Sequence, residues 1–148
     1  MKKRNILIGI VVIFIAMQFY RPNKPVFVNA TLDDFLLYEK APKEVANLFK
    51  TSCYNCHSDQ TETFWHNTIA PVSWWTDGHV KEARSNLNFS NWATYDTRDK
   101  RAKLSAIAVN IKENTMPLKS YVLAHSEAKL SEEEKKKIMD WLFTVDTE

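Results

Sequence analysis

Glycine is scarce in this chain, with two residues among 148. Turn-rich β folds and phosphate-binding loops depend on glycine for backbone conformations that other residues avoid. The scarcity therefore disfavours a β architecture, and neither a P-loop nor a G-x-G-x-x-G pattern occurs in the sequence. No convincing strand pattern, internal repeat or low-complexity tract is present either. We expect one all-α domain behind a separate N-terminal segment.

Acidic residues are missing from the first 24 positions, which carry five basic residues. The remainder of the chain then holds 15 basic and 18 acidic residues, a net charge of about −3. A nucleic-acid-binding domain carries a clustered basic surface, so this distribution predicts no nucleic-acid partner. We expect the protein to be a monomer.

The first 20 residues have the pattern of an export segment. Lys2-Lys3-Arg4 precede an apolar run from Ile6 to Tyr20, which is short for a full membrane span of roughly 17–25 residues. The run does not end in a small-residue cleavage site. No cysteine directly follows it, as lipidation would require. We predict an uncleaved signal-anchor over residues 1–20, with a cleaved signal peptide as the alternative. The positive-inside rule then places the rest of the chain on the periplasmic, extracytoplasmic side of the cytoplasmic membrane.

The only two cysteines form the pattern Cys53-x-x-Cys56-His57. This pattern is typical of covalent c-type haem attachment, in which two thiols on one helical turn bond the vinyl groups of haem and the next histidine ligates the iron. Three other interpretations stay open. A zinc site needs a fourth ligand, a thioredoxin-like motif needs a βαβ unit that the sequence does not show, and the two thiols can also form a structural disulfide.

Helical patterns surround this motif. Residues 21–30 contain two prolines and indicate an extended linker, so the domain is assigned to residues 31–148. The segment from Pro42 to Phe49 has the apolar spacing of a helix that leads directly into the motif. A further helix is predicted from Pro71 to about Ser85, interrupted or ended near Gly78.

Two more helices are predicted in the C-terminal half. One covers residues 97–113, where apolar residues recur with helical spacing. The last begins after Ser131, which forms a capping box with Glu134, and it buries Ile138, Trp141 and Leu142.

Met116 is the predicted second axial ligand of the iron. It lies in a loop after the long helix and is followed at once by Pro117. A thioether opposite a histidine raises the reduction potential of haem iron, which suits electron transfer. His125 and His79 are the alternatives, because ligation by two histidines is chemically as reasonable. The plain alternative for a loop methionine is packing.

Several other residues are candidates for the surroundings of the haem. A ligating imidazole usually donates its second N–H to a carbonyl, and the expected acceptor is the carbonyl of Ala70 or Pro71. Arg84 is expected to pair with a haem propionate, with a solvated surface charge as the alternative. The candidates for the walls of the pocket are aromatic, and each is as consistent with ordinary core packing: Trp74, Trp75, Trp92 and Tyr121.

In this ordered set of motifs the chain resembles the bacterial haem-binding domain family, of the c-type cytochrome kind, over about residues 31–145. One departure is Ala83, where relatives are expected to have glycine, and it affects local packing rather than ligation. The residues that carry the resemblance are Ser52–Ser58, Ile69–Trp74, His79–Arg84, Leu87–Trp92, Met116-Pro117, Tyr121, His125 and Leu130-Ser131.

The resemblance implies haem binding, a helical fold like that of class I cytochrome c, and electron transfer to a redox partner that it does not identify. In that fold the first and last helices cross. We therefore expect Leu48 or Phe49 to contact Trp141 or Leu142.

The combined prediction is a membrane-tethered electron carrier with one haem c, held through Cys53 and Cys56. His57 and Met116 are the predicted ligands of the iron. The alternatives are a peroxidase-like enzyme, in which His125 serves as the acid–base group, or a haem-based sensor. Both alternatives require an open sixth position on the iron.

Overall fold

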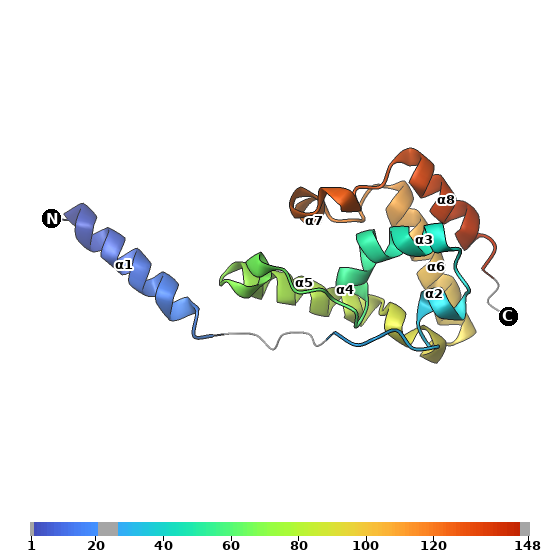
Figure 1. Cartoon of the computed structure of the whole chain (residues 1–148), viewed down its shortest axis with the longest axis horizontal. Coiled ribbons are helices and arrows are strands. Elements are labelled where there is room, and N and C mark those ends of the chain that lie inside the picture. The colour runs from blue at the N-terminus through green and yellow to red at the C-terminus, as the bar shows by residue number, and fades with distance from the viewer. Residues whose placement is uncertain (1, 21–26, 146–148) are drawn as a thin grey trace.

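The computed structural model describes residues 2–20 and 27–145, and the chain is 69% helical with no strand in those ranges. This confirms the all-α prediction. Figure 1 shows the arrangement of the helices, among which η1 is a π-helical segment and η2 to η4 are 3-10 turns. The elements are α1 (Lys2–Met17), α2 (Phe35–Tyr38), α3 (Lys43–Phe49), η1 (Lys50–Tyr54), α4 (Asn55–His57), η2 (Trp65–Thr68), α5 (Val72–Asn86), η3 (Phe89–Thr94), α6 (Thr97–Lys112), α7 (Lys119–Ala124), η4 (Ser126–Ala128) and α8 (Glu132–Leu142).

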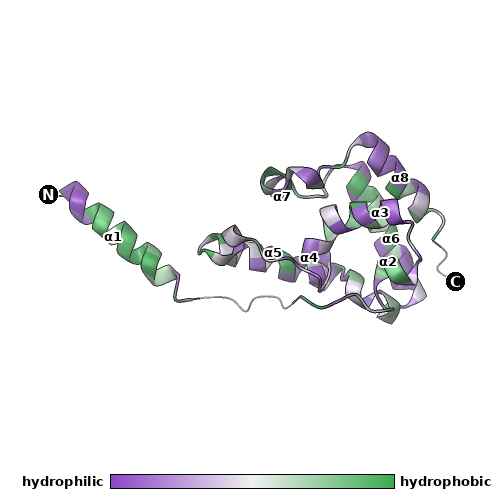
Figure 2. Ribbon diagram, in the orientation of Figure 1, coloured by the Kyte–Doolittle hydropathy of each residue, from purple (hydrophilic) through white to green (hydrophobic). Residues whose placement is uncertain are grey.

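The N-terminal helix α1 lies to one side of the other helices in Figure 1. None of its residues is buried, and Figure 2 shows that it is hydrophobic along most of its length. Among the described residues, no helix combines the length and the apolarity that crossing a membrane requires. Most of the predicted linker, residues 21–30, lies outside the described residues. In the part that is described, the backbone N–H of Val28 donates to the carbonyl of Asp59 at 2.9 Å.

The segment that carries the two cysteines follows one continuous helical path. α3 begins after Pro42, as predicted, and buries Val45 and Phe49 on its inner face. The path widens to the π-helical turn η1 and then closes as α4, which ends at His57. π-helical turns are rare and occur frequently at functional sites. Here the turn contains Cys53 and separates the helix that packs in the core from the one that presents His57.

An aromatic cluster forms the core against which this path packs. Phe35 is fully buried at its centre, and its ring centroid lies 4.6 Å from Trp92 and 5.3 Å from Trp141. Phe89 stacks on Phe35 at 5.1 Å. Phe49 meets Trp141 edge-on at 5.7 Å, which confirms the predicted contact between α3 and α8. Because such aromatic pairs contribute about 0.5–1.5 kcal/mol each beyond their buried area, these rings join α2, α3, η3 and α8 into one unit.

Two further predicted helices are confirmed at nearly the expected bounds. α6 begins after Asp96, whose side chain accepts a hydrogen bond from the N–H of Asp99. α8 begins after Ser131 with the predicted capping box to Glu134, and Ile138, Trp141 and Leu142 are buried. The local capping chemistry therefore sets both helix starts.

The predicted break near Gly78 is wrong, because α5 runs without interruption to Asn86. A glycine in a helix costs only about 1 kcal/mol, and the packing of α5 against α4 and η2 offsets that cost. Leu87 then leaves the helix. The next turn is capped by Asn88, whose side chain accepts from the Ser90 N–H at 3.0 Å.

A buried carboxyl group ties the segment before α2 to the cysteine motif. Asp34 is 1% exposed and accepts hydrogen bonds from the Leu36 N–H at 3.1 Å, the Tyr54 hydroxyl at 2.8 Å and the Gln60 amide at 2.8 Å. Burial raises the pKa of Asp34 above its ordinary value of 3.8, and the three hydrogen bonds offset part of that effect. Burial is the main cause that raises the pKa of the Tyr54 hydroxyl, and the neighbouring Asp34 carboxylate raises it further.

The raised pKa of Asp34 predicts a pH dependence of stability. Just above pH 3.8 the folded protein keeps a proton on Asp34 that the unfolded chain releases, so stability falls as pH rises through the folded pKa. Asp34→Asn removes this proton uptake. We expect the free energy of unfolding of the wild type, relative to Asp34→Asn, to decrease over that pH window, as urea unfolding at a series of pH values measures. Asp33→Asn, which removes an exposed neighbouring carboxyl, is the matched control, and an equal trend there would contradict the assignment.

The aromatic core predicts a large cost for truncating Phe49. Its side chain is fully buried and contacts the rings of Phe35, Phe89 and Trp141. Phe49→Ala should lower the free energy of unfolding by about 3–5 kcal/mol, because it removes buried apolar area and leaves a cavity. Chemical denaturation of the purified protein measures this loss. Phe143→Ala is the control, since Phe143 is 81% exposed, and equal losses in both variants would be inconsistent with the packing described.

Candidate functional site

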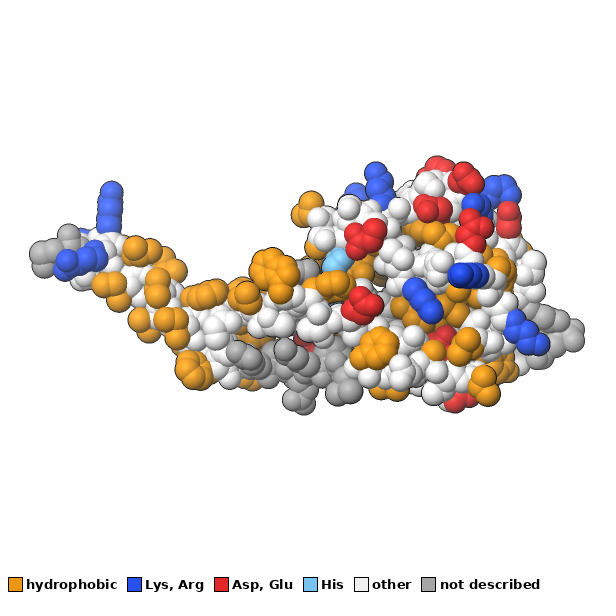
Figure 3. Space-filling view, viewed as in Figure 1, with side chains coloured by type: hydrophobic (Ala, Val, Ile, Leu, Met, Phe, Trp, Pro, Cys, Tyr) orange, Lys and Arg blue, Asp and Glu red, His pale blue; other side chains and the backbone are white. Residues whose placement is uncertain are grey.

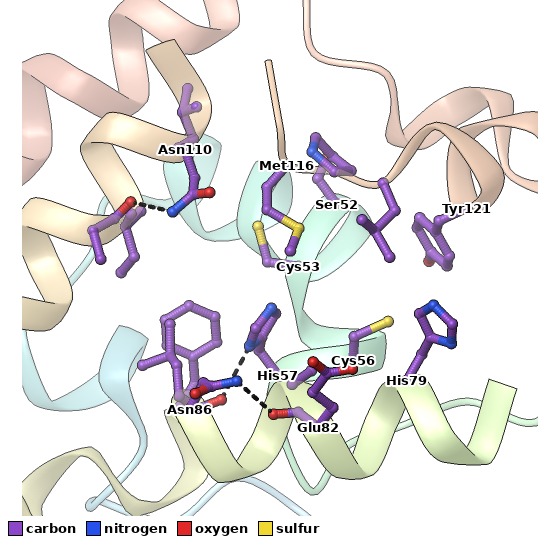
Figure 4. A pocket seen from close by; sticks show the side chains of 18 of the residues that line it. Ser52, Cys53, Cys56, His57, His79, Glu82, Asn86, Asn110, Met116 and Tyr121 are labelled. Carbon is purple, nitrogen blue, oxygen red and sulfur yellow. Dashed lines mark hydrogen bonds between the residues drawn. The ribbon is translucent and has the colours of Figure 1, made fainter. Parts of the chain in front are cut away.

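A pocket of about 480 Å³ opens next to the cysteine motif, which is within the range of about 300–1,000 Å³ that is usual for small-molecule sites. Figure 4 shows α5 below the pocket, α6 at one side and the segment from Met116 to Tyr121 above it. The residues that line it are Ser52, Cys53, Cys56, His57, His79, Glu82, Ala83, Asn86, Leu87, Phe89, Lys103, Ala106, Ile107, Asn110, Ile111, Met116, Pro117, Leu118 and Tyr121.

Both cysteines line the pocket as free thiols. In Figure 4 their sulfur atoms lie apart, with Cys53 near Met116 and Cys56 on the side of His79. Burial is the main cause that raises the pKa of Cys53, to about 12, and it also raises the pKa of Cys56. Both groups are therefore thiols rather than thiolates at neutral pH. This separation and protonation fit two independent bonds to one large ligand.

The other interpretations of the motif fit the structure less well. Among the described residues, no three His, Cys, Asp or Glu side chains converge as a metal-holding group. The two thiols are not joined as a disulfide. The described part of the chain has no strand from which a thioredoxin-like unit could be built.

His57 faces the pocket as a neutral imidazole. Its Nδ1 lies 3.1 Å from the carbonyl of Leu87, and because a carbonyl only accepts, Nδ1 carries the hydrogen. Burial lowers the pKa of His57, although hydrogen bonds to the carbonyls of Leu87 and Ala83 act in the opposite direction. Nε2 is left without a hydrogen, which is the form that ligates iron. The sequence placed this acceptor at Ala70 or Pro71, and that prediction is wrong.

The position of Leu87 explains the error. Pro71 and Leu87 stand at opposite ends of α5, a helix of 15 residues, which is roughly 22 Å long. Because α5 continues through Gly78, its C-terminal end reaches the back of His57 while its N-terminal end points away. The carbonyl of Ala70 instead accepts from the side-chain amide of Gln18 at 3.2 Å.

Met116 lies on the opposite wall of the pocket from His57 in Figure 4, and its side chain points inward. Its backbone is held at the end of α6, where the N–H of Thr115 donates to the carbonyl of Asn110 at 3.0 Å and the N–H of Met116 donates to the same carbonyl at 3.4 Å. Asn114 has a positive φ of 58° and ends the helix, a conformation that asparagine tolerates. The loop geometry therefore fixes which way the methionine faces.

The two alternative histidines occupy different environments. His79 lines the pocket, and its Nδ1 lies 2.9 Å from the carbonyl of Trp75 one turn earlier. His125 is buried outside the pocket lining. Its ring stacks on that of Tyr121 at 4.5 Å and is tilted against that of Phe64 at 4.3 Å. Of the two, only His79 borders the space where a ligand would lie.

Tyr121 lines the pocket and joins α7 to the cysteine motif. Its hydroxyl accepts a hydrogen bond from the side-chain amide of Asn55 at 2.7 Å and donates to the carbonyl of Thr51 at 3.4 Å. Burial raises the pKa of Tyr121, so the hydroxyl stays protonated and available as a donor. The structure thus brings together the predicted residues Cys53, Cys56, His57, Met116 and Tyr121 around one cavity.

Five other predicted site residues lie outside the pocket lining, and Trp75, which is half exposed on α5, is one of them. Trp92 is fully buried in the aromatic core, where its Nε1 donates to Glu39 at 2.5 Å. Pro71 and Trp74 lie at the N-terminal end of α5, and Trp74 Nε1 donates to the carbonyl of Tyr20 at 2.9 Å. The guanidinium of Arg84 donates to the carbonyl of Ser58 and to the Thr61 hydroxyl, and it forms an ion pair with Asp59 at 3.4 Å.

Sequence reasoning missed the α6 wall of the pocket. Lys103, Ile107 and Asn110 line it at spacings of four and three residues, and Lys103 is the one lysine or arginine among the lining residues. Its Nζ donates to the carbonyl of Asn86 at 2.8 Å and lies 4.3 Å from the ring centre of Tyr95. The helical spacing was present in the sequence, but it is shared by any exposed helix face and so carries little information by itself.

The residues present fit a haem. Two separated thiols, a neutral imidazole with its second nitrogen satisfied, and a thioether on the facing wall surround a cavity with many apolar side chains. Haem iron is commonly held by histidine, alone or together with methionine. This donor set and its placement match that chemistry.

Comparison with known proteins agrees with the geometry. The profile of the haem-binding domain family matches residues 12–144, which covers most of the chain and every residue of the pocket lining. Searches of curated proteins and of solved structures returned no significant match. The chain therefore belongs to the haem-binding domain family.

Proposed function

We propose that the protein is a membrane-tethered electron carrier with one haem c covalently held in the pocket described above. When bound, the haem would supply a one-electron change between ferric and ferrous iron. The observation that carries the proposal is the position of His57 and Met116 on facing walls of one pocket that also contains both thiols. The crossing of α3 and α8 through Phe49 and Trp141 supports a fold like that of class I cytochrome c.

The residues of the chain have distinct roles in this proposal. Cys53 and Cys56 would hold the haem through thioether bonds at two separate points. His57 would ligate the iron through Nε2, while the Leu87 carbonyl fixes its ring and increases its basicity. Met116 would ligate from the other face and raise the reduction potential. Lys103, at the edge of the pocket, is placed to neutralise a propionate, the role that the sequence assigned to Arg84.

An electron carrier fits the site better than an enzyme or a sensor. Those functions need an open position on the iron, and the sequence offered His125 as the acid–base group beside it. His125 lies between two aromatic rings outside the pocket lining, stacked on Tyr121 and tilted against Phe64, and its Nδ1 lies 3.3 Å from the Glu127 carboxylate. Met116 instead lines the same pocket as His57, on the facing wall.

The tether rests on the character of α1. A helix that is hydrophobic on every side is normally buried in protein or in a membrane, yet no residue of α1 is buried. Its 16 residues give a length of about 24 Å, somewhat less than the roughly 30 Å of a bilayer core. We infer that α1 holds the domain at the extracytoplasmic face of the cytoplasmic membrane, where a redox partner meets it. The acidic balance of the remaining chain favours a basic partner surface.

Covalent attachment predicts a result for the two cysteines. Cys53→Ser combined with Cys56→Ser should abolish haem staining of the protein on a denaturing gel, because no bond remains that survives unfolding. Mass spectrometry of the wild type should show the protein plus one haem. Met116→Ala is the control, since it leaves both thiols in place and should stain like the wild type. Staining that persists in the double variant would exclude attachment through these cysteines.

The proposed axial ligand predicts a spectroscopic change. Met116→Ala should lower the reduction potential and remove the weak far-red charge-transfer band that methionine ligation gives to oxidised haem, because the thioether no longer binds iron. Optical spectra and a redox titration of the purified protein measure both effects. Met139→Ala, a methionine that packs against the core on α8, should leave them unchanged. An unaltered low-spin spectrum in Met116→Ala would assign the position to another residue, with His79 the nearest alternative.

A further inference from the structure

One end of the domain presents a cluster of exposed hydrophobic side chains, which we call the α5 tip and define as Trp65, Ile69, Val72 and Trp75. Their exposed fractions are 77%, 39%, 43% and 50% respectively. Trp65 lies on η2, Ile69 lies between η2 and α5, and the other two lie on the first turn of α5, at the end opposite to Leu87. Large apolar side chains gathered on one surface usually mark a binding face.

The α5 tip is also uncharged. In a chain with 26% charged residues, positions 63–76 contain no Asp, Glu, Lys or Arg. The flanking charge at Asp77 is already paired with Lys81 at 2.6 Å. A surface that binds a charged protein partner would carry charges of its own, whereas this one offers indole rings and aliphatic groups. Tryptophan is enriched where a protein meets the boundary between lipid and water.

Three hydrogen bonds join Ala70 and Trp74, which are neighbours of the α5 tip in the sequence, to the chain immediately after α1. The Gln18 side chain donates to the Ala70 carbonyl at 3.2 Å and accepts from the Ala70 N–H at 3.0 Å. Trp74 Nε1 donates to the carbonyl of Tyr20 at 2.9 Å, and the two rings meet edge-on at 5.6 Å. Figure 3 shows hydrophobic side chains extending from α1 to this end of the domain. The tip therefore lies where α1 ends.

We propose that the α5 tip inserts into the interfacial layer of the bilayer that α1 enters. The proposal rests on the tethering role given to α1 above and adds an orientation to it. Since α5 runs from the tip to Leu87, the helix would hold the back of His57 roughly 22 Å along its axis from the tip. The pocket wall at His79, whose ring lies 4.3 Å from that of Trp75, would lie closer to the lipid. A single tether leaves the domain free to rotate, whereas two contacts restrict which face a partner meets.

The full-length, haem-loaded protein in phosphatidylcholine nanodiscs tests this orientation. All five tryptophans are replaced biosynthetically with fluorotryptophan, and fluorine NMR signals are compared between discs with and without a lipid whose headgroup carries gadolinium. We expect the signals of Trp65 and Trp75 to be lost to broadening. Trp92 and Trp141, which lie in the core, should stay sharp and serve as internal controls. The broadening should persist at about 1 M salt, where the Debye length is about 3 Å, because no charge is involved.

Matched variants separate the α5 tip from other exposed apolar residues. Trp75→Glu should restore a sharp Trp65 signal, because a carboxylate in the tip opposes insertion. Leu123→Glu places the same charge at a residue that is 90% exposed on α7 and should leave both tip signals broadened. Equal effects of the two variants would overturn the proposal.

Co-flotation of the same protein with vesicles distinguishes the two levels of the proposal. If the protein floats but Trp65 and Trp75 stay sharp, the tether stands and the insertion of the α5 tip is wrong. If the protein does not float, both are wrong. Sharp signals together with a dimer that Trp75→Glu dissociates in sedimentation would assign the tip to a second copy of the chain, which also overturns insertion.

Discussion

The hydrogen bond from His57 Nδ1 to the Leu87 carbonyl is the contact on which the site depends. It leaves Nε2 facing the cavity without a hydrogen, and burial keeps the ring neutral by lowering its pKa. The bond exists because α5 is uninterrupted and delivers Leu87 to the back of α4. A helix that ended at Gly78 would leave the imidazole without an acceptor and its tautomer unfixed. The length of α5 therefore determines the tautomer of His57, although His57 lies on α4.

The aromatic core fixes the helix that leads into the cysteine motif. Phe35, Phe49 and Trp141 join α2, α3 and α8, so the helical path into the cysteines starts from a fixed position. The buried carboxyl of Asp34 extends this fixation to Tyr54 within the motif and to Gln60 just after it. Holding a buried carboxyl costs free energy, as its raised pKa indicates. Despite this cost, the hydrogen bonds of Asp34 hold Tyr54 and Gln60 in place on either side of His57.

Local chemistry was readable from the sequence, and the meeting of distant segments was not. The capping box of Ser131 and the apolar face that contains Phe49 follow from residues three or four apart, and both are confirmed. The motif and Met116 could be predicted as pocket residues from their spacing and from the proline that follows the methionine, although each had alternative interpretations. The sequence could not show whether Trp92 and Trp74 line the pocket, pack in the core or contact another segment near the surface. A tryptophan suits all three environments. The sequence did not identify Leu87 as the hydrogen-bond acceptor of His57, because every residue has a backbone carbonyl.

The variable positions inside the motif have a structural role of their own. Asn55 donates to the Tyr121 hydroxyl from between the two cysteines, and its own carbonyl accepts from the Thr61 hydroxyl. Tyr121 lies on α7, five residues after the proposed ligand Met116. The wall that carries histidine and the segment that follows the methionine are thus joined by a hydrogen bond between protein side chains. Because this link needs no ligand, the protein itself contributes to the spacing between the two walls of the pocket.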